Sequence, residues 1–149
     1  MKEAPAAFEL AEKIKEQLSK LLETTDWRLT NTTDKCEYSE KLTTGDYVLR
    51  LAGEPIASFR LYPMINCCGI CVSTAASVIP SFRGKGLGTL LNSIRIDIAR
   101  CDGYGLLLCT DIAQNEVQRK ILKRNGWSDI KSFINPRTKN HIFISCINL

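Results

Sequence analysis

The sequence predicts an α/β domain in which helices cover a β-sheet, and three observations lead to this fold class. Its 149 residues are 44% hydrophobic and 24% charged, which suits one core-forming domain over residues 1–149. Segments with helical and strand patterns follow in the order helix, three strands, helix, strand, helix, two strands. A glycine-rich loop joins the third strand to the second helix.

The N-terminal half begins with an amphipathic helix over residues 6–23. Its apolar side chains recur at helical spacing: Ala7, Leu10, Ile14, Leu18, Leu21 and Leu22. Residues 24–45 are polar, apart from a short strand expected at Trp27–Thr30. Two β-prone runs flank the expected hairpin turn Gly53-Glu54-Pro55: Tyr47–Ala52 and Ile56–Tyr62.

The middle of the chain contains the elements around the glycine-rich loop. A strand is expected at Ile70–Ile79, where small central residues leave space for a ligand, and Pro80 ends it. The next helix has one apolar face, made of Leu87, Leu90, Leu91, Ile94 and Ile98. Leu106–Thr110 is continuously apolar, which is typical of a buried strand.

The C-terminal part is expected to contain a helix at Gln114–Arg124, with Val117 and Ile121 facing inward and Gly126 ending it. Two closing strands are joined by a turn over residues 135–140: Trp127–Ile134 and His141–Leu149. We treat the last strand as an edge strand, apolar enough to pair across a homodimer or to belong to the core.

Charge is distributed unevenly along the chain, whose formal net charge is +4. Residues 80–149 hold eleven Lys or Arg and five Asp or Glu, a net charge of +6. This suits an anionic partner, either nucleic acid or a phosphorylated cofactor, although a solvated basic surface explains it equally well. No segment approaches the ~20 apolar residues of a membrane span, and no signal-peptide core is visible, so we expect a cytoplasmic protein.

The seven cysteines indicate reduced thiols, because their number is odd and no secretion signal accompanies them. Cys68 and Cys71 have C-x-x-C spacing, but no second pair follows and His141 is the only histidine. We therefore expect no metal site. Cys109 lies in an apolar run without a histidine nearby in sequence, which favours inert burial over a nucleophilic role.

The segment Val78–Thr89 is the one that indicates chemistry. A strand runs into a glycine-rich loop that opens a helix, so the backbone can approach a ligand and the first helical N–H groups converge on one point. With the helix dipole they form an anion site, and Arg83 and Lys85 add positive charge at its rim. We expect a pyrophosphate there. Neither the P-loop pattern nor the dinucleotide-binding fingerprint fits the spacing of Gly84, Gly86 and Gly88.

A different six-residue pattern, R-x-x-G-x-G, does fit at Arg83, Gly86 and Gly88. It resembles the coenzyme A signature of the GNAT superfamily of N-acetyltransferases. The family's downstream spacing, an Asn followed by a Gly-aromatic pair, is kept by Asn115, Gly126 and Trp127. The order of elements also matches the family from Tyr47 to Leu149, with the CoA-binding core at about residues 70–127.

The resemblance implies a mixed, mostly antiparallel sheet that is flanked by helices and splayed between its central strands, Ile70–Ile79 and Leu106–Asp111. Acetyl-CoA would lie in this wedge as co-substrate. The backbone amides of Val78 and Ile79 would bind its pantetheine arm, with Val78 also polarising the acetyl carbonyl. Asn115 would hydrogen-bond near that arm. The pyrophosphate would be held by Arg83, Gly84, Lys85, Gly86, Leu87, Gly88 and Thr89. The acetyl group would pass to a primary amine by direct attack.

Two positions depart from the family's pattern for proton transfer. Leu122 stands where many relatives have a tyrosine acid, and Thr110 where some have a carboxylate base. Either the chain needs no dedicated acid, because a thiol of pKa about 8.5 is a fair leaving group, or another group substitutes. The candidates are Asp111, Tyr104, Glu54 and Asp46. We favour Asp111 as the catalytic residue, with a helix-capping turn as its alternative.

Two other function classes also fit the sequence. The missing proton-transfer residues suit a GNAT-like binding or regulatory module. A nucleic-acid-binding protein is suggested by one basic helix, with Arg119, Lys120, Lys123 and Arg124, although no nucleic-acid motif is present. The acceptor amine is not indicated, because residues 1–46 carry no motif and begin with a helix where the family begins with a strand. Four acidic residues are candidates to attract it: Glu37, Glu40, Asp46 and Glu54.

Overall fold

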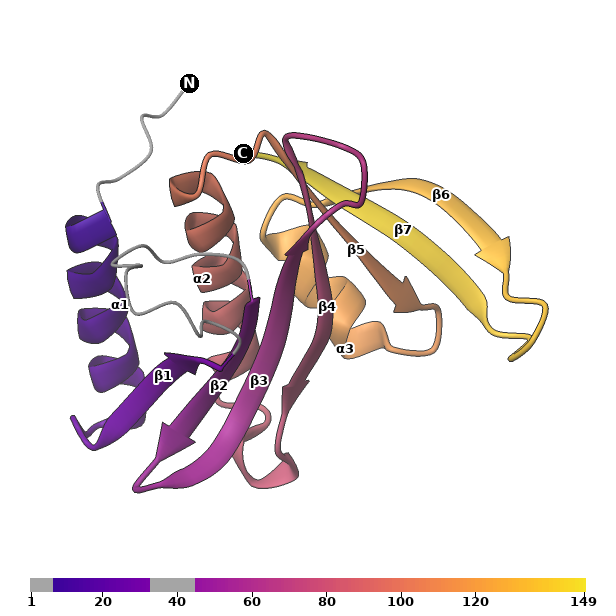
Figure 1. Ribbon diagram of the computed structural model, residues 1–149. Helices are drawn as coiled ribbons and strands as arrows, with labels where there is room; N and C mark the ends of the chain where they lie inside the picture. Colours follow the sequence, from indigo (N-terminus) through magenta and orange to yellow (C-terminus); the bar gives the residue numbers. More distant parts are fainter. Residues whose placement is uncertain (1–6, 33–44) are drawn as a thin grey trace.

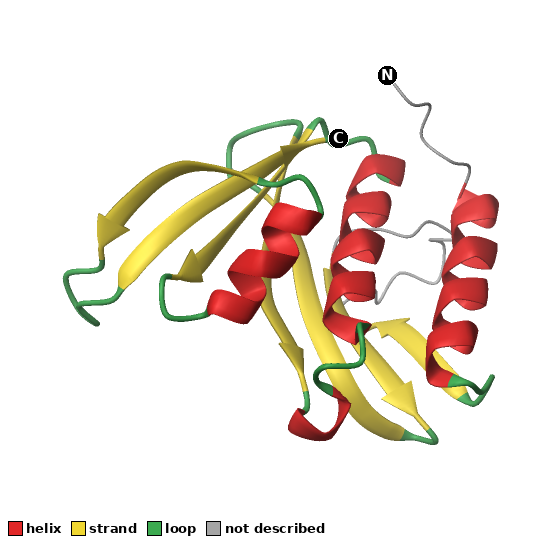
Figure 2. Cartoon of the chain, turned by 180° about the vertical axis from the view of Figure 1, so that it is seen from behind, coloured by secondary structure: helices red, strands yellow, loops and turns green. Residues whose placement is uncertain are grey.

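The computed structural model describes residues 7–32 and 45–149, which form one seven-stranded sheet with the order β1-β2-β3-β4-β5-β7-β6 (Figure 1). The helices are α1 (Ala7–Leu22), the 3₁₀ turn η1 (Pro80–Phe82), α2 (Leu87–Cys101) and α3 (Glu116–Arg124). The strands are β1 (Trp27–Asn31), β2 (Gly45–Leu51), β3 (Glu54–Pro63), β4 (Ile70–Val78), β5 (Leu106–Ile112), β6 (Ser128–Ile134) and β7 (His141–Asn148). Figure 2 shows the three α-helices side by side on one face of the sheet. The predicted α/β fold with a mixed, mostly antiparallel sheet is confirmed.

The first helix is confirmed, and it packs against α2 on that face of the sheet (Figure 2). Leu10, Ile14 and Leu18 are buried, as their helical spacing requires. A charged contact also joins the two helices, because Lys13 of α1 donates to the buried Asp97 of α2 at 2.7 Å. The helical layer over β1–β4 therefore contains one core and at least one partly buried ion pair.

The hairpin between β2 and β3 turns earlier than expected. Leu51 pairs with Glu54, so the turn consists of Ala52 and Gly53, with φ of 48° and 84°. Positive φ at both central residues suits the twist of a two-residue hairpin, and this preference outweighed the turn signal of Pro55. The prediction that Glu54 and Pro55 form the turn is wrong, because both begin strand β3.

Strand β4 contains a bulge in its pairing with β3, close to the point where its pairing with β5 ends. Arg60 pairs with Thr74 and Ser58 with Ser77, so two residues of β4 oppose Phe59 alone. One of them, Ala75, has φ of 51°. β4 pairs with β5 in parallel only over Ile70–Ser73, after which the two strands diverge (Figure 1). The predicted splaying between these strands is confirmed.

The faces that strand β5 and helix α3 bury differ from those that the sequence predicts. β5 is buried on one side only, because Leu107, Cys109 and Asp111 alternate with more exposed residues. In α3 the expected inward residue Val117 is 71% exposed, whereas Leu122 is 3% exposed. The helix lies over the opening between β4 and β5, so its Val117 side borders a cavity instead of the core.

The C-terminal strands are confirmed, but their order is not the expected one. β7 lies between β5 and β6, so the prediction of an edge strand at His141–Leu149 is wrong. The edge is β6, whose residues are all exposed, including Ile130, Phe133 and Ile134. Gly126 ends α3 as expected, with φ of 86° and with its N–H donated to the Lys123 carbonyl.

Candidate functional site

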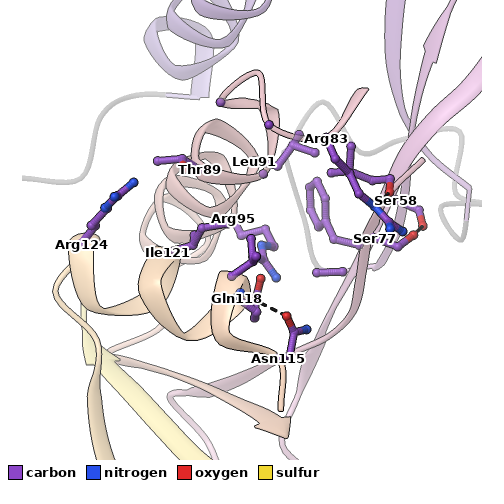
Figure 3. A pocket seen from close by; sticks show the side chains of 17 residues that line it. Ser58, Ser77, Arg83, Thr89, Leu91, Arg95, Asn115, Gln118, Ile121 and Arg124 are labelled. Atoms are coloured by element: carbon purple, nitrogen blue, oxygen red, sulfur yellow. Dashed lines mark hydrogen bonds between the residues drawn. The ribbon is translucent and has the colours of Figure 1, made fainter. Parts of the chain in front are cut away.

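A cavity of about 630 Å³ occupies the space where β4 and β5 diverge (Figure 3). Its walls come from β3, the bulged end of β4, the glycine-rich loop, α2 and α3. The polar side chains that line it are Ser58, Ser77, Arg83, Thr89, Arg95, Asn115, Gln118 and Arg124. Among the described residues no acidic side chain lines this cavity, and its three arginines make it electropositive.

The glycine-rich loop ends at the first turn of α2, as the sequence predicts. Gly84 and Gly86 have φ of 76° and 87°, where a Cβ atom would be strained, and Gly86 is the N-terminal cap residue. No side chain caps the helix, so its first N–H groups are open toward the loop. Arg83 Nε donates to the Val78 carbonyl at 2.8 Å and ties the loop to β4. This arrangement suits an anion such as a phosphate.

Most of the residues expected to bind the cofactor are brought together at this cavity. Its lining includes Val78, Arg83, Gly84, Gly86, Gly88, Thr89 and Asn115. Leu87 is different, because its side chain is buried in the core. Lys85 lies with its ammonium 5.1 Å from the Phe82 ring and does not line the cavity. The side chains of Leu87 and Lys85 therefore do not line the cavity, while the part that their backbone plays in holding a pyrophosphate stays a prediction.

The two backbone amides expected to face the ligand point in opposite directions. The Ile79 N–H donates to the Ile56 carbonyl at 2.9 Å, so it belongs to the sheet and the expectation for this amide is wrong. Ala57 and Val78 are opposite each other in the same ladder. Because N–H directions alternate along a strand, the Val78 N–H points away from β3, toward the diverging side. One amide, that of Val78, is left for a ligand.

Helix α3 provides the opposite wall through its first turn. The Asn115 side chain accepts from the Gln118 N–H at 3.2 Å and caps the helix, while both residues line the cavity (Figure 3). Sequence reasoning identified Asn115 and named Arg124 among the basic residues of this helix, but it missed Gln118 and Arg95. A signal for Arg95 was available, because it lies between Ile94 and Ile98 on the apolar side of the predicted helix.

Asp111, the favoured catalytic residue, does not line the cavity. Arg119 of α3 donates to it at 3.0 Å and to Asp129 at 2.6 Å, while lying 3.6 Å from the centre of the Phe143 ring. Burial raises the pKa of Asp111, and Arg119 opposes that rise. The Ser145 hydroxyl, which donates to Asp129, lowers the pKa of that carboxyl. The carboxylate of Asp111 is held in an ion pair that joins α3 to the sheet, so the structure supports a structural role, and the catalytic role stays a prediction.

The other proton-transfer candidates also lie away from the cavity lining. Asp46 accepts from the Tyr62 hydroxyl at 2.8 Å and from Arg60 at 3.0 Å. Tyr104 precedes β5 at the end where β4 and β5 are paired, and Glu54 begins β3. Burial raises the pKa of the Cys109 thiol to about 12, which agrees with inert burial. Glu37 and Glu40 lie outside the described residues.

Among the described residues, no group of three or more His, Cys, Asp or Glu side chains is arranged to hold a metal ion. No described helix is both long and apolar enough to cross a membrane.

No protein-family model matches the sequence, and no curated protein matches it either. Solved structures do match. Naa50 of Arabidopsis thaliana, in complex with a CoA-containing bisubstrate analogue, has a TM-score of 0.67 at 11% identity and covers 83% of this chain and 99% of its own. Ard1 of Thermoplasma volcanium also has a TM-score of 0.67 at 11% identity, over 83% of this chain and 98% of its own.

A GNAT family acetyltransferase from Elizabethkingia anophelis, with acetyl-CoA bound, has a TM-score of 0.65 at 14% identity and covers 83% of this chain and 99% of its own. At these identities the likeness concerns the fold. The chain therefore has the GNAT fold, and the resemblance inferred from the glycine-rich loop is confirmed at that level.

Proposed function

We propose that this GNAT-fold chain is an N-acyltransferase that uses acetyl-CoA to acylate a primary amine. The observation that carries the proposal is the electropositive cavity where β4 and β5 diverge. One end of this cavity is formed by the N-terminus of α2, which no side chain caps. A diphosphate joined to a long, uncharged arm fits such a site, with the phosphates at the loop and the arm between the strands. Structural neighbours with bound acetyl-CoA or a CoA analogue support this choice of ligand.

In the proposed reaction this chain contributes positioning and polarisation. The N–H groups around Gly86 and the guanidinium of Arg83 hold the diphosphate, and the Val78 N–H donates to the thioester carbonyl oxygen. The amine nitrogen attacks the carbonyl carbon, so a C–N bond forms and the C–S bond breaks with its electron pair leaving on sulfur. The nitrogen loses one proton to water.

Among the described residues, no His, Asp, Glu, Cys, Lys or Tyr side chain lines the cavity, so its lining offers no general acid or base. The leaving thiol, with a pKa of about 8.5 if it resembles cysteine, can depart without an acid. The amine must then reach the site in its neutral form. We expect the rate to rise with pH and to follow the pKa of the acceptor amine, without the second limb that an essential enzyme acid would add.

The same observation favours one second candidate, a CoA-binding module without turnover. A cavity that binds the ligand but carries no acid or base suits a regulatory protein that senses acyl-CoA. Turnover of acetyl-CoA with any amine would contradict this candidate.

We also propose that the exposed edge strand β6 is the strand through which a homodimer of this chain would pair.

The first experiment is a thermal-shift titration with acetyl-CoA, free CoA and NAD. Ligand at about 100 times its Kd adds about 2.7 kcal/mol of stability, which for this size is about 5–11 °C in Tm. We expect shifts with both CoA compounds and none with NAD. The absence of any shift would refute the proposal. Amines are then screened for turnover by release of free thiol.

A matched pair of variants tests the loop itself. A Cβ atom at Gly88 would lie 3.3 Å from the end of the flexible Ile121 side chain, so both Gly88→Glu and Gly88→Gln can fold after a small shift. The two side chains are similar in size and differ in charge. We expect the glutamate to abolish CoA binding and the glutamine to weaken it less, because only the former repels the diphosphate. Equal affinities in the two variants would contradict an anion site at this loop.

A further inference from the structure

A buried arginine lies inside the cavity, away from the glycine-rich loop. Arg95 of α2 is only 3% exposed, yet its side chain extends into the space between α2, α3 and β4 (Figure 3). Its Nη1 donates to the Ser73 hydroxyl at 2.8 Å, and the guanidinium carbon lies 5.9 Å from the centre of the Phe59 ring. Its Nε has no hydrogen-bond partner, and no carboxylate of the described residues forms an ion pair with it.

A buried cation without an anion is unusual, because burial removes the hydration that stabilises its charge. Burial lowers the pKa of Arg95 to about 10, so the guanidinium is still charged at neutral pH. The nearby Cys109 does not neutralise it, since burial raises the pKa of that thiol to about 12. The unused donor and the uncompensated charge both point to an anion that arrives from outside.

The place of Arg95 in the cavity separates it from the diphosphate site. About two helical turns, or about 12 Å, lie between the first residue of α2 and Arg95. Its partner Ser73 is paired with Cys109, and this is the last β4–β5 pair before the strands diverge. Arg95 is therefore at the inner apex of the wedge, deeper than Val78 as seen from the loop. If the thioester lies at Val78, a group at the far end of the acyl chain points toward Arg95.

We infer that Arg95 binds a carboxylate at the distal end of the acyl group, so that the preferred donor is the CoA thioester of a dicarboxylic acid. The planar guanidinium supplies its unused Nε donor to a carboxylate oxygen, and low exposure strengthens the contact. This inference rests on the proposed acyltransferase function and replaces acetyl-CoA by a dicarboxylic acyl-CoA as the preferred donor. The transfer step is unchanged, and the distal carboxylate takes no part in it.

The test compares two donors with the same four-carbon chain, succinyl-CoA and butyryl-CoA, of which only the first ends in a carboxylate. Calorimetric titration of the full chain should show succinyl-CoA binding about 10- to 100-fold more tightly. Methionine is similar to arginine in length but neutral. In Arg95→Met the affinity for succinyl-CoA divided by that for butyryl-CoA should therefore fall to about one or below. Ser73→Ala removes the same hydrogen bond but keeps the cation, and it should keep the preference.

Each outcome decides one question. Equal affinities in the wild type, or a ratio unchanged in Arg95→Met, overturn the inference while CoA binding stands. If Arg95→Met binds free CoA, butyryl-CoA and succinyl-CoA more weakly by the same factor, the inference is also overturned, because the arginine then contacts a part common to all three. If Arg95→Met loses turnover only with amine acceptors that carry a carboxylate, the anion belongs to the acceptor, and the inference is overturned too. If the wild type does not bind free CoA, the proposed function itself is refuted.

If Arg95→Met does not fold, the affinity ratio in the wild type and the Arg95→Lys variant decide the question. We expect Arg95→Lys to keep part of the preference for succinyl-CoA.

Discussion

Replacing Arg119 by methionine tests whether Asp111 is structural or catalytic. In the native chain Arg119 donates to Asp111 at 3.0 Å and to Asp129 at 2.6 Å, and the Asp111 side chain is 3% exposed. Methionine keeps a long side chain over Phe143 but leaves the buried carboxylate without a cation. We therefore expect a loss of stability that comes mainly from Asp111.

The size of this loss follows from the exposure of the three side chains. Breaking a buried ion pair costs about 3–5 kcal/mol, and the low end applies because Arg119 is itself 16% exposed. The pair with Asp129, which is 39% exposed, adds at most about 1 kcal/mol. A loss of about 3 kcal/mol lowers Tm by about 6–12 °C at this chain length.

The loss of stability in Arg119→Met should be larger at neutral pH than at acidic pH. Burial raises the folded-state pKa of Asp111 above its unfolded value, and removing Arg119 raises it further. A raised carboxyl pKa contributes stability that is fully present below the unfolded pKa and is lost as pH rises through the folded pKa. The difference in Tm between wild type and variant is therefore largest at pH 7 and narrows toward pH 4.

The assay is a set of melts followed by circular dichroism at pH 7 and pH 4, with Lys120→Met as the control. Lys120 is exposed on the same helix, so its variant should melt within about 0.5 kcal/mol of the wild type. A wild-type Tm in Arg119→Met would contradict a structural role for the ion pair between Arg119 and Asp111. So would an Asp111→Asn variant that keeps its Tm but loses turnover, because that is the behaviour of a catalytic base.

Two further predictions concern residues whose burial the structure assigns. Leu122→Ala should cost about 2–5 kcal/mol in urea unfolding, whereas Val117→Ala should stay within about 0.5 kcal/mol, and similar costs would contradict the orientation of α3. In the native protein at pH 8 iodoacetamide should modify the exposed Cys68, while Cys71 and Cys109, whose pKa burial raises to about 12, react only after unfolding. Peptide mass spectrometry checks this, and modification of Cys109 at the rate of Cys68 would show that the strand opens.

Where the determining contacts are local, sequence reasoning was sufficient. The run from β4 through Pro80 to the glycine-rich loop and α2 was expected in this order, because proline and glycine act on their own backbone angles. The anion site follows from the same segment, since any helix start without a side-chain cap presents its N–H groups. Asn115 as a helix cap and Gly126 as a helix stop are likewise effects within one or two turns.

The face that an element buries, and the side chain that a residue pairs with, could not be predicted from local patterns. The pattern of α3 predicts an apolar face but not whether that face meets the core or a cavity, and Val117 borders the cavity while Leu122 meets the core. The bulge at Ala75 depends on a register with β3 that no local signal sets. Asp111 is an available carboxylate in sequence, and only the approach of Arg119 from the next helix shows that it is already paired.

The order of the elements, the glycine-rich loop at the start of α2 and the class of fold could be predicted from the sequence alone, because each depends on backbone preferences of neighbouring residues. The folded arrangement was needed to show which amide faces the wedge, that of Val78, and that Arg95 has no ion-pair partner among the described residues. Hydrogen-bond direction in a sheet depends on the partner strand, and the free energy of a buried charge depends on every group around it. Those groups come from β3, β4, α2 and α3, which meet only in the folded chain.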